Sequence, residues 1–162
     1  MKKEEKVYDT LDKLDIAYCI NEHPAVYTVE EAQGHCSSIP GTHCKNLFLT
    51  DTKGRRHYLI VMRNNKKLDI KKLAERIGEK GLKFASERRL KEYLDLTPGS
   101  VSPFGVVNDI NNEVIVVLDE ELKDSKQINF HPNINTITLT LKYEDFERFL
   151  EQCGNQVIYL DI

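Results

Sequence analysis

Apolar and polar residues recur along the chain at two spacings, and each spacing predicts a different kind of element. Apolar positions three or four residues apart predict amphipathic helices at 4–15, 70–77, 86–94 and 143–153. Apolar runs and strict alternation predict strands at 17–20, 44–50, 57–62, 104–107, 114–118, 127–130, 136–141 and 157–160. The capping-box pattern Thr28-Val29-Glu30-Glu31 predicts another short helix that reaches about Gln33.

The order of these elements favours one sheet with helices packed around it. Segments 44–50 and 57–62 flank turn residues and predict a hairpin, and segments 104–107 and 114–118 predict a second pair of strands. Because helices and strands do not alternate regularly, we expect an α/β (α+β) fold with a mixed, largely antiparallel sheet. The 162 residues suffice for one hydrophobic core, and no linker or repeat divides them. We therefore expect a single domain over residues 1–162.

Composition indicates a soluble globular protein, since 40% of the residues are hydrophobic and 30% are charged. No apolar run approaches the length that spans a membrane, and no apolar stretch follows the charged N-terminal residues. The expectation is a cytoplasmic, unprocessed chain with no membrane contact. Nothing in the sequence indicates an oligomer, so a monomer is the default expectation.

The distribution of charge is more informative than the net charge of −3. Basic residues gather in the region between the predicted hairpin turn and the helix that follows it. Such a cluster suits a phosphate backbone, although it is also typical of an ordinary solvated face. The candidates for nucleic-acid contact are Arg55, Arg56, Arg63, Lys66 and Lys67.

The four cysteines are widely scattered and are expected to be reduced thiols: Cys19, Cys36, Cys44 and Cys153. The pairs His35-Cys36 and His43-Cys44 raise the possibility of zinc, because imidazole and thiolate are good zinc ligands. However, adjacent residues on an extended segment point to opposite sides, and no CxxC spacing is present. We therefore predict no metal site.

The stretch from Leu96 to Gly105 is the first candidate for chemistry, because two prolines and two glycines exclude a regular helix or a central strand. Ser100, Val101 and Ser102 then have backbone N–H groups without an obvious ladder partner. Such a loop suits the binding of a carbonyl or an anion by the main chain. The alternative is an ordinary surface connection.

Two side chains next to predicted strands are further candidates. Lys45 begins an apolar strand and could hold a phosphate or a hydroxyl, or it could simply protect a strand edge. His131 precedes a proline where a strand ends, and it could form a hydrogen bond near neutral pH or remain in water. His23 offers the same choice. The sequence contains no nucleophile elbow and no phosphate loop, so an enzyme of this kind would hold water and a labile bond together.

Taken in order, several segments resemble the bacterial prolyl-tRNA editing proteins of the YbaK/ProRS-associated deacylase superfamily. The nearest branch is the free-standing alanyl-tRNA(Pro) deacylases, which are ProX- or PrdX-like. The resemblance spans nearly the whole chain and rests on the ordered set rather than on one motif. The segments are Lys45-Asn46-Leu47-Phe48-Leu49-Thr50-Asp51, Phe84-Ala85-Ser86, Pro98-Gly99-Ser100-Val101-Ser102-Pro103-Phe104, Asn108-Asp109, Val116-Val117-Leu118-Asp119 and His131-Pro132-Asn133.

The resemblance implies the editing-domain fold and hydrolysis of the ester that joins a wrong amino acid to the terminal adenosine of tRNA(Pro). The family's Gly-x-x-x-Pro loop matches Gly99 to Pro103, and its amides are expected to hold the aminoacyl carbonyl. Lys45 matches the lysine that contacts the terminal nucleotide, with Asn46 beside it in the substrate site. His131 matches the histidine that lines the amino-acid pocket. No cofactor is implied, because a ribose hydroxyl of the tRNA is thought to assist the water.

Selectivity is expected to be steric, since a missing methylene is worth only about 1–3 kcal/mol in the synthetase's own pocket. A second pocket too small for proline would remove alanine, and its wall candidates are Ile20, Phe48 and Val101. One alternative is a deacylase for cysteinyl-tRNA(Pro). Another is a catalytically silent module that binds tRNA or regulates. The expected partners are the acceptor end of mischarged tRNA(Pro) and prolyl-tRNA synthetase.

Overall fold

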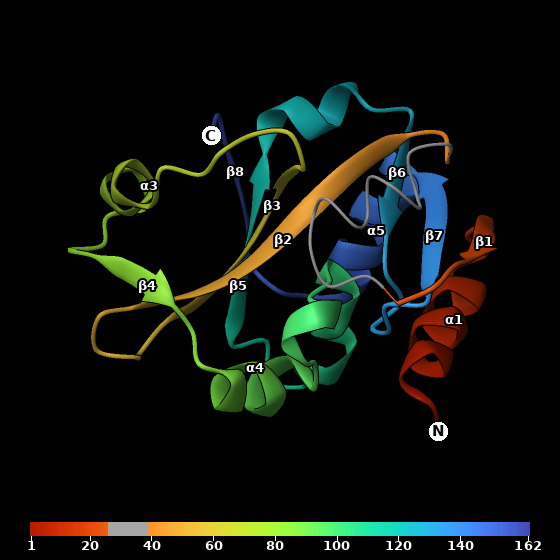
Figure 1. Ribbon diagram of the computed structural model, residues 1–162, viewed down its shortest axis with the longest axis horizontal. Coiled ribbons are helices and arrows are strands. Elements are labelled where there is room, and N and C mark those ends of the chain that lie inside the picture. The colour runs from red at the N-terminus through yellow and green to blue at the C-terminus, as the bar shows by residue number, and fades with distance from the viewer. Residues whose placement is uncertain (26–38) are drawn as a thin grey trace.

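The computed structural model describes residues 1–25 and 39–162, and these residues build one mixed sheet (Figure 1). Its strands follow the order β1-β7-β6-β2-β3-β5-β8, with β4 attached to β2. Three pairs, β2·β6, β3·β5 and β5·β8, are parallel, while β1·β7, β6·β7, β2·β3 and β2·β4 are antiparallel. The strands are β1 (Tyr18–Glu22), β2 (Thr42–Asp51), β3 (His57–Arg63), β4 (Leu82–Phe84), β5 (Val114–Asp119), β6 (Gln127–Phe130), β7 (Ile137–Lys142) and β8 (Val157–Leu160).

The helices begin and end where the sequence supplies caps. The side chains of Asp69 and Ser86 accept hydrogen bonds from the first turns of α3 and α4. Gly78 and Gly154, both with positive φ, end α3 and α5 in the left-handed region that glycine adopts readily. The helices are α1 (Lys3–Lys13), α3 (Ile70–Ile77), α4 (Glu87–Leu94) and α5 (Tyr143–Cys153), with 3-10 turns η1 (Pro98–Ser100), η2 (Pro103–Asn108) and η3 (Glu120–Asp124).

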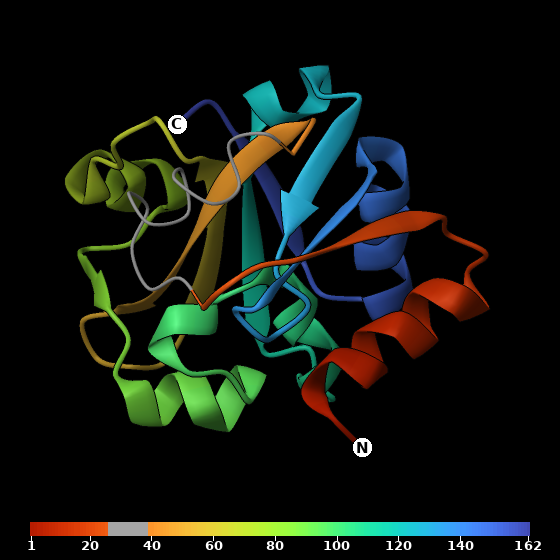
Figure 2. The same ribbon diagram turned by 45° about the vertical axis from the view of Figure 1, so that its right-hand side comes forward.

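The sheet has a separate hydrophobic core on each face. The larger core joins side chains of α1, α4, η2 and α5 to one face, and four phenylalanines lie at its centre: Phe104, Phe130, Phe146 and Phe149. The smaller core joins Leu73 of α3 to the other face. In Figure 2, α3 lies on the left of the sheet, and α1 and α5 lie on the right. Alternation along β2 sends Phe48 into the larger core and Leu49 into the smaller one.

The predicted fold class, the four helices predicted within the described ranges and most predicted strands are confirmed, but the prediction of a strand at 104–107 is wrong. These residues lie in η2, which Pro103 begins and the side chain of Ser102 caps. Gly105 packs so tightly that a Cβ there would lie 2.7 Å from a methyl carbon of Leu96. The place beside β5 is occupied by β3 on one side and β8 on the other. The apolar pattern at 104–107 therefore reports burial rather than strand pairing.

The helix predicted from Thr28 lies outside the described residues, as does the His35-Cys36 pair. The alternation of polar and apolar residues at 136–141 is typical of a half-buried strand, but β7 is buried on both faces from Thr138 to Leu141. In the described ranges, no helix is long and apolar enough to cross a membrane. The same ranges contain no cluster of three or more His, Cys, Asp or Glu side chains suited to a metal ion.

Candidate active site

The candidate site lies along the edge of β2 that faces away from β3. On this edge β6 pairs only with Thr42 and His43, and β4 pairs only with the residues from Leu49 to Asp51. Between them, Cys44 to Leu47 has no strand partner on this side among residues 1–25 and 39–162. In Figure 1, β2 crosses the middle of the molecule, with β6 and β7 to its right and β4 to its left. We call this interval the β2 gap.

The loop predicted to carry chemistry is fixed at the β2 gap by two asparagines. Asn46 on β2 donates from Nδ2 to the carbonyl oxygen of Val101, at 3.3 Å. Asn133, in the turn after β6, donates from Nδ2 to the carbonyl oxygen of Phe104, at 3.4 Å. The loop is therefore held from β2 at one point and from the end of β6 at the other. This arrangement joins three segments that lie far apart in the sequence.

Hydrogen bonds within the loop make it rigid. The N–H of Ser100 donates to the carbonyl of Thr97, and the N–H of Gly105 donates to the carbonyl of Ser102. The hydroxyl of Ser102 accepts from the N–H of Phe104 at 3.2 Å, and both serines of the loop are buried. Val101 is half-buried, between Gly99 and Pro103 at the two ends of the predicted motif. The loop is thus a preorganised backbone element and not a loose surface connection.

Lys45 is half-buried on β2, and burial lowers the pKa of its ammonium group. It pairs with Met62, a member of the smaller core, so it projects to that face of the sheet, whereas Asn46 projects to the other. A lysine that has lost part of its hydration shell favours an anionic or hydroxyl partner more strongly than a fully solvated one. The two neighbouring polar residues therefore serve opposite sides of the strand.

His131 is held in one orientation by the backbone of the neighbouring strand. Its Nδ1 lies 2.9 Å from the carbonyl oxygen of Ile137, so Nδ1 carries the proton and Nε2 is the acceptor atom of the neutral ring. Burial lowers the pKa of His131. Its ring centre lies 5.8 Å from that of His23, whose Nε2 is 2.8 Å from the hydroxyl of Thr138. His131 is therefore neutral at pH 7.

The strand register brings Lys45 and His131 to the same level of the sheet. His43 on β2 pairs with Asn129 on the parallel strand β6. Lys45 and His131 each follow these paired residues by two positions, which is the repeat of a strand. Both residues therefore project to the same face on neighbouring parallel segments, where the strands stop pairing. The structure thus places the lysine, Asn46, the loop and the histidine around one gap.

The three predicted wall residues are not equivalent. Val101 and Phe48 both line a hollow next to the β2 gap, although Phe48 is 5% exposed and belongs mainly to the larger core. Ile20 lies on β1, and strands β7 and β6 separate it from β2. It pairs with Leu139 of the larger core, and it is 50% exposed. The structure therefore does not bring Ile20 to the β2 gap.

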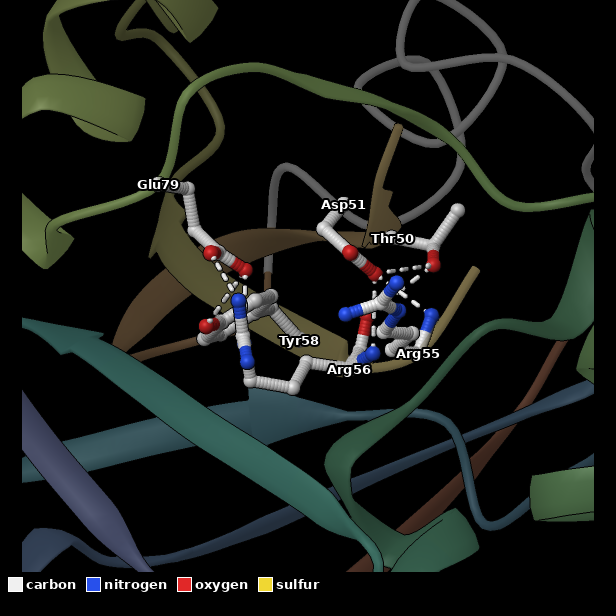
Figure 3. A network of polar contacts seen from close by, with 6 residues as sticks. All are labelled: Thr50, Asp51, Arg55, Arg56, Tyr58 and Glu79. Atoms are coloured by element: carbon white, nitrogen blue, oxygen red, sulfur yellow. Dashed lines mark hydrogen bonds and ion pairs between the residues drawn. The ribbon is translucent and has the colours of Figure 1, made fainter. Parts of the chain in front are cut away.

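The basic residues proposed for RNA contact are partly neutralised by carboxylates. Figure 3 shows Arg56, whose Nε donates to Glu79 at 3.0 Å, while the hydroxyl of Tyr58 donates to the same carboxylate at 3.0 Å. In the same view, Asp51 accepts from the backbone N–H groups of Arg55 and Arg56 at 2.7 and 2.8 Å. The hydrogen bond from the N–H of Arg56 is the main cause of the lowered pKa of Asp51.

Two of the other basic candidates, Arg63 and Lys66, lie at the opposite end of β3. Lys66 donates to the buried carboxylate of Asp119 at 2.6 Å, and Arg63 lies 3.9 Å from Glu121. Burial alone would lower the pKa of Lys66, but the hydrogen bond and charge of Asp119 outweigh it and raise that pKa. Arg55 and Lys67 are exposed and have no ion pair within the part of the chain that the structure describes. Of the five predicted basic residues, these two therefore carry a charge that no carboxylate in the described ranges neutralises.

Asn133 is a site residue that the sequence interpretation quoted but did not select. It is 1% exposed and has a φ of 66°, in the left-handed region that asparagine adopts more often than other non-glycine residues. Because its Nδ2 must face the carbonyl of Phe104, its Oδ1 is turned away. That oxygen, like Oδ1 of Asn46, has no donor within the described residues. The only sequence signal was its position after His131-Pro132.

Comparison with solved structures defines the fold class first. A crystal structure described as that of a candidate trans-editing enzyme for prolyl-tRNA synthetase superposes with a TM-score of 0.72. The alignment covers 99% of this chain and 97% of the other, at 22% sequence identity. This likeness shows that the two chains share a fold.

Sequence comparison then shows the family. The model of the aminoacyl-tRNA editing domain family matches residues 23–149. The prolyl-tRNA editing protein ProX of Acetoanaerobium sticklandii is 46% identical over 155 residues, which cover 96% of this chain and 94% of that protein. Prolyl-tRNA synthetase associated domain-containing protein 1 of Danio rerio is 38% identical over 93% of this chain and 82% of its own length. This chain belongs to the aminoacyl-tRNA editing domain family, and it is an aminoacyl-tRNA deacylase. The predicted resemblance is confirmed.

Proposed function

We propose that this chain is a trans-editing enzyme that hydrolyses alanyl-tRNA(Pro), so that alanine is not inserted at proline codons. The observation that carries the proposal is the β2 gap, where Asn46 and Asn133 fix the loop from two sides. Lys45 and His131 lie at the same level of the two strands that border it. The relative from A. sticklandii is called a prolyl-tRNA editing protein, which supports tRNA(Pro) as the substrate of this chain.

In the proposed reaction a water molecule attacks the ester carbonyl between alanine and the terminal ribose. The backbone N–H groups of Val101 and Ser102, between Gly99 and Pro103, stabilise the oxyanion that forms, and the preorganised loop supplies them without rearrangement. Lys45 binds a phosphate or hydroxyl of the terminal nucleotide as a point charge. The bond to the ribose oxygen then breaks, that oxygen takes up a proton, and free alanine and uncharged tRNA leave.

His131 is proposed to position the substrate from the amino-acid pocket. Its Nδ1 proton is committed to the carbonyl of Ile137, so the neutral ring offers Nε2 as an acceptor. A hydrogen bond from the ammonium group of the aminoacyl moiety would use this acceptor. In this proposal a ribose hydroxyl next to the ester activates the water, because Nε2 of His131 is already engaged by the ammonium group of the substrate. Proximity supplies much of the acceleration for such a labile ester.

The preference for alanine over proline is steric in this proposal. A pocket bounded by Val101 and Phe48 admits a methyl side chain and excludes the proline ring, which is the second sieve that a synthetase lacks. The choice of alanine rather than cysteine rests on the resemblance of the segments at 45–49 and 131–132 to the alanyl branch. Deacylation of cysteinyl-tRNA(Pro) is the alternative activity of the same site.

The proposed partners are the acceptor end of mischarged tRNA(Pro) and prolyl-tRNA synthetase. The name of the D. rerio relative, a synthetase-associated domain protein, supports the second partner. Arg55 and Lys67 are the proposed phosphate contacts of the acceptor stem, with Arg56, Arg63 and Lys66 in supporting positions. A monomer that works in the cytoplasm, where translation takes place, completes the proposal.

The test compares deacylation of alanyl-, cysteinyl- and prolyl-tRNA(Pro) by the purified protein under identical conditions. Fast release of alanine, with prolyl-tRNA(Pro) left intact, is the expected result. Preferential release of cysteine would move the activity to the alternative substrate. If tRNA(Pro) binds but none of the three esters is hydrolysed faster than in buffer, the proposed activity is wrong.

A further inference from the structure

Two rings outside the amino-acid pocket support the wall that Phe48 forms. Phe48 stacks on His57 of β3 with ring centres 5.6 Å apart, and His57 packs against Tyr93 of α4 with ring centres 4.0 Å apart. His57 is 1% exposed, and neither it nor Tyr93 is among the described residues that line the hollow shared by Phe48 and Val101. The orientation of the Phe48 ring therefore depends on side chains that do not reach the pocket.

Arg89 connects α4 to the turn of the β2–β3 hairpin. Its Nη1 donates to the carbonyl oxygen of Gly54 at 3.0 Å and lies 3.1 Å from Nε2 of His57. Because a guanidinium group only donates hydrogen bonds, Nε2 of the neutral His57 ring is the acceptor. A Cβ at Gly54 would lie 2.8 Å from Cζ of Arg89. The guanidinium group thus lies directly on the backbone of the turn, which only a glycine leaves open.

Helix α4 also forms the side of the hollow that faces Phe48. Glu87 and Leu90 of this helix line the hollow together with Phe48 and Val101, and its volume is about 220 Å³. The helix then leads into the loop that carries Val101. A displacement of α4 relative to the hairpin would therefore change the distance between the two sides of the hollow.

Two kinds of contact hold α4 in place, and they differ in how narrowly they define its position. Leu90 and Leu94 are buried in the larger core and hold the helix against the sheet. Apolar burial is non-directional, so it tolerates small shifts of the helix. Hydrogen bonds require donor–acceptor distances close to 3 Å. The bonds of Arg89 to the hairpin therefore define the position of α4 more closely than the leucines do.

We propose that Arg89 is a positioning residue that determines amino-acid specificity: its bonds to Gly54 and His57 keep the hollow too narrow for the proline ring. The inference rests on the proposed function, in which this hollow selects alanine by size. Proline exceeds alanine by two methylene groups, so a small widening of so small a hollow would admit it. Arg89 is not among the described residues that line the hollow, and it acts through α4 and Phe48.

The test compares kcat/KM for alanyl-tRNA(Pro) and prolyl-tRNA(Pro) in Arg89→Met, which keeps the apolar stem and removes the donors. The preference for alanine should fall about tenfold, mainly because prolyl-tRNA(Pro) is hydrolysed faster. Arg89→Lys keeps a charged donor for the carbonyl of Gly54, and its preference should stay within about threefold of the unaltered protein. Arg88→Met is the matched control, because Arg88 is the exposed neighbour on α4, and its preference should be unchanged.

Three results would overturn the inference. The first is an unchanged preference in a folded Arg89→Met protein. The second is an equal fall of kcat/KM for both esters together with a lower unfolding temperature, because Arg89 would then act only on stability. The third is an equal rise of KM for both esters at full stability, because Arg89 would then contact the RNA rather than set the width of the hollow.

Urea unfolding checks the contact itself without a substrate. His57→Phe keeps a ring between Phe48 and Tyr93 but removes the acceptor of Arg89. If the two side chains are coupled, the midpoint shift of Arg89→Met/His57→Phe is smaller than the sum of the two single shifts. Additive shifts would show that the bond does not hold α4, and they would contradict the inference.

The inference and the proposed function fail in different ways. If the unaltered protein hydrolyses alanyl-tRNA(Pro) and spares prolyl-tRNA(Pro), and Arg89→Met does so with the same ratio, the role of Arg89 is wrong and the proposed function stands. If the unaltered protein releases cysteine instead, a tenfold fall of the cysteinyl-to-prolyl ratio in Arg89→Met still supports the role of Arg89. If no ester is hydrolysed, the proposed function is wrong and the inference falls with it.

Discussion

Two polar regions along β2, one at its hairpin end and one at the β2 gap, differ in how fully their hydrogen bonds are made. At the hairpin end, Asp51 accepts from two backbone N–H groups, and Glu79 accepts from Arg56 and Tyr58. At the β2 gap, Asn46 and Asn133 each donate once and keep an Oδ1 without a donor in the described ranges. The first region stabilises the fold, whereas the second leaves bonding capacity for a ligand.

The difference can be expressed as free energy. A buried acceptor without a donor costs about 1–3 kcal/mol, and a folded protein keeps such a group where function requires it. Asn133 adds a left-handed backbone conformation at the same place. Unsatisfied groups, a partly desolvated lysine and a rigid loop therefore meet at the β2 gap. The hairpin network has none of these features, although it contains more charge.

The largest expected effect is the loss of activity in Lys45→Ala. Removal of a positioned charge that binds the substrate should lower kcat/KM for alanyl-tRNA(Pro) about 100-fold or more. Stability should be unchanged or slightly higher, because the substitution removes a partly buried ammonium group. Deacylation kinetics and thermal unfolding check the two statements. Lys13→Ala, which alters an exposed lysine of α1, is the control, and normal deacylation by a folded Lys45→Ala protein would refute the site.

The hairpin network should respond in the opposite sense, with stability lost and activity kept. Glu79→Ala leaves the buried hydroxyl of Tyr58 without its acceptor, a loss of about 1–3 kcal/mol in the free energy of unfolding. The double variant Tyr58→Phe/Glu79→Ala should recover part of that loss. Urea unfolding measures the free energy, and kcat should stay within about twofold of the unaltered protein. If the Glu79→Ala protein were fully folded and its kcat still fell strongly, the network would belong to the active site.

The stabilising contribution of Glu79 should also depend on pH. The hydrogen bond from Arg56 is the main cause of the lowered pKa of Glu79. A carboxyl group with a lowered pKa contributes its full stability above its ordinary value of 4.5 and loses it as the pH falls through the lowered value. The difference in stability between Glu79→Gln and the unaltered protein should therefore shrink in acid. Parallel urea titrations below pH 5 would show this, and a constant difference would contradict it.

A smaller effect on activity is expected at Asn133, because it acts through the loop. Asn133→Gly tolerates the left-handed backbone but removes the bond to the carbonyl of Phe104. We expect about a tenfold fall in kcat/KM with little loss of stability, whereas Asn133→Ala should lose both. Kinetics and thermal unfolding of the pair separate positioning from strain. Full activity in Asn133→Gly would show that the loop does not need this contact.

The smallest expected effect concerns His57, which is buried between Phe48 and Tyr93 and accepts from Arg89 at Nε2. Burial, followed by the charge of Arg89, lowers the pKa of His57. A histidine that stays neutral in the fold contributes full stability above its ordinary value of 6.5, and this contribution declines as the pH falls below that value. His57→Gln should flatten this decline in urea unfolding. An unchanged decline would assign it to His131, whose pKa is also lowered.

Local patterns in the sequence determined the elements of this protein. Some signals act over only a few residues, so the helix ends and the strand alternation that they set follow from the sequence. Examples are the caps Asp69 and Ser86, the glycine Gly78 at the end of α3 and the alternation of β2. The prolines and glycines at 96–105 also act locally, because they prevent a regular helix or strand in that loop. The resemblance added Lys45 and His131, and the strand register places these two residues at the same level beside the β2 gap.

The tertiary structure alone decided which segments meet. Only the strand order shows that β2 has two partial neighbours on one edge, that Ile20 lies two strands away and that η2 replaces an expected strand. The roles of Asn133 and Arg89 depend on contacts between residues separated by 29 and 35 positions. Side-chain spacing along a chain fixes local conformation, whereas the pairing of distant strands depends on the whole core, and the β2 gap exists only because that pairing is incomplete.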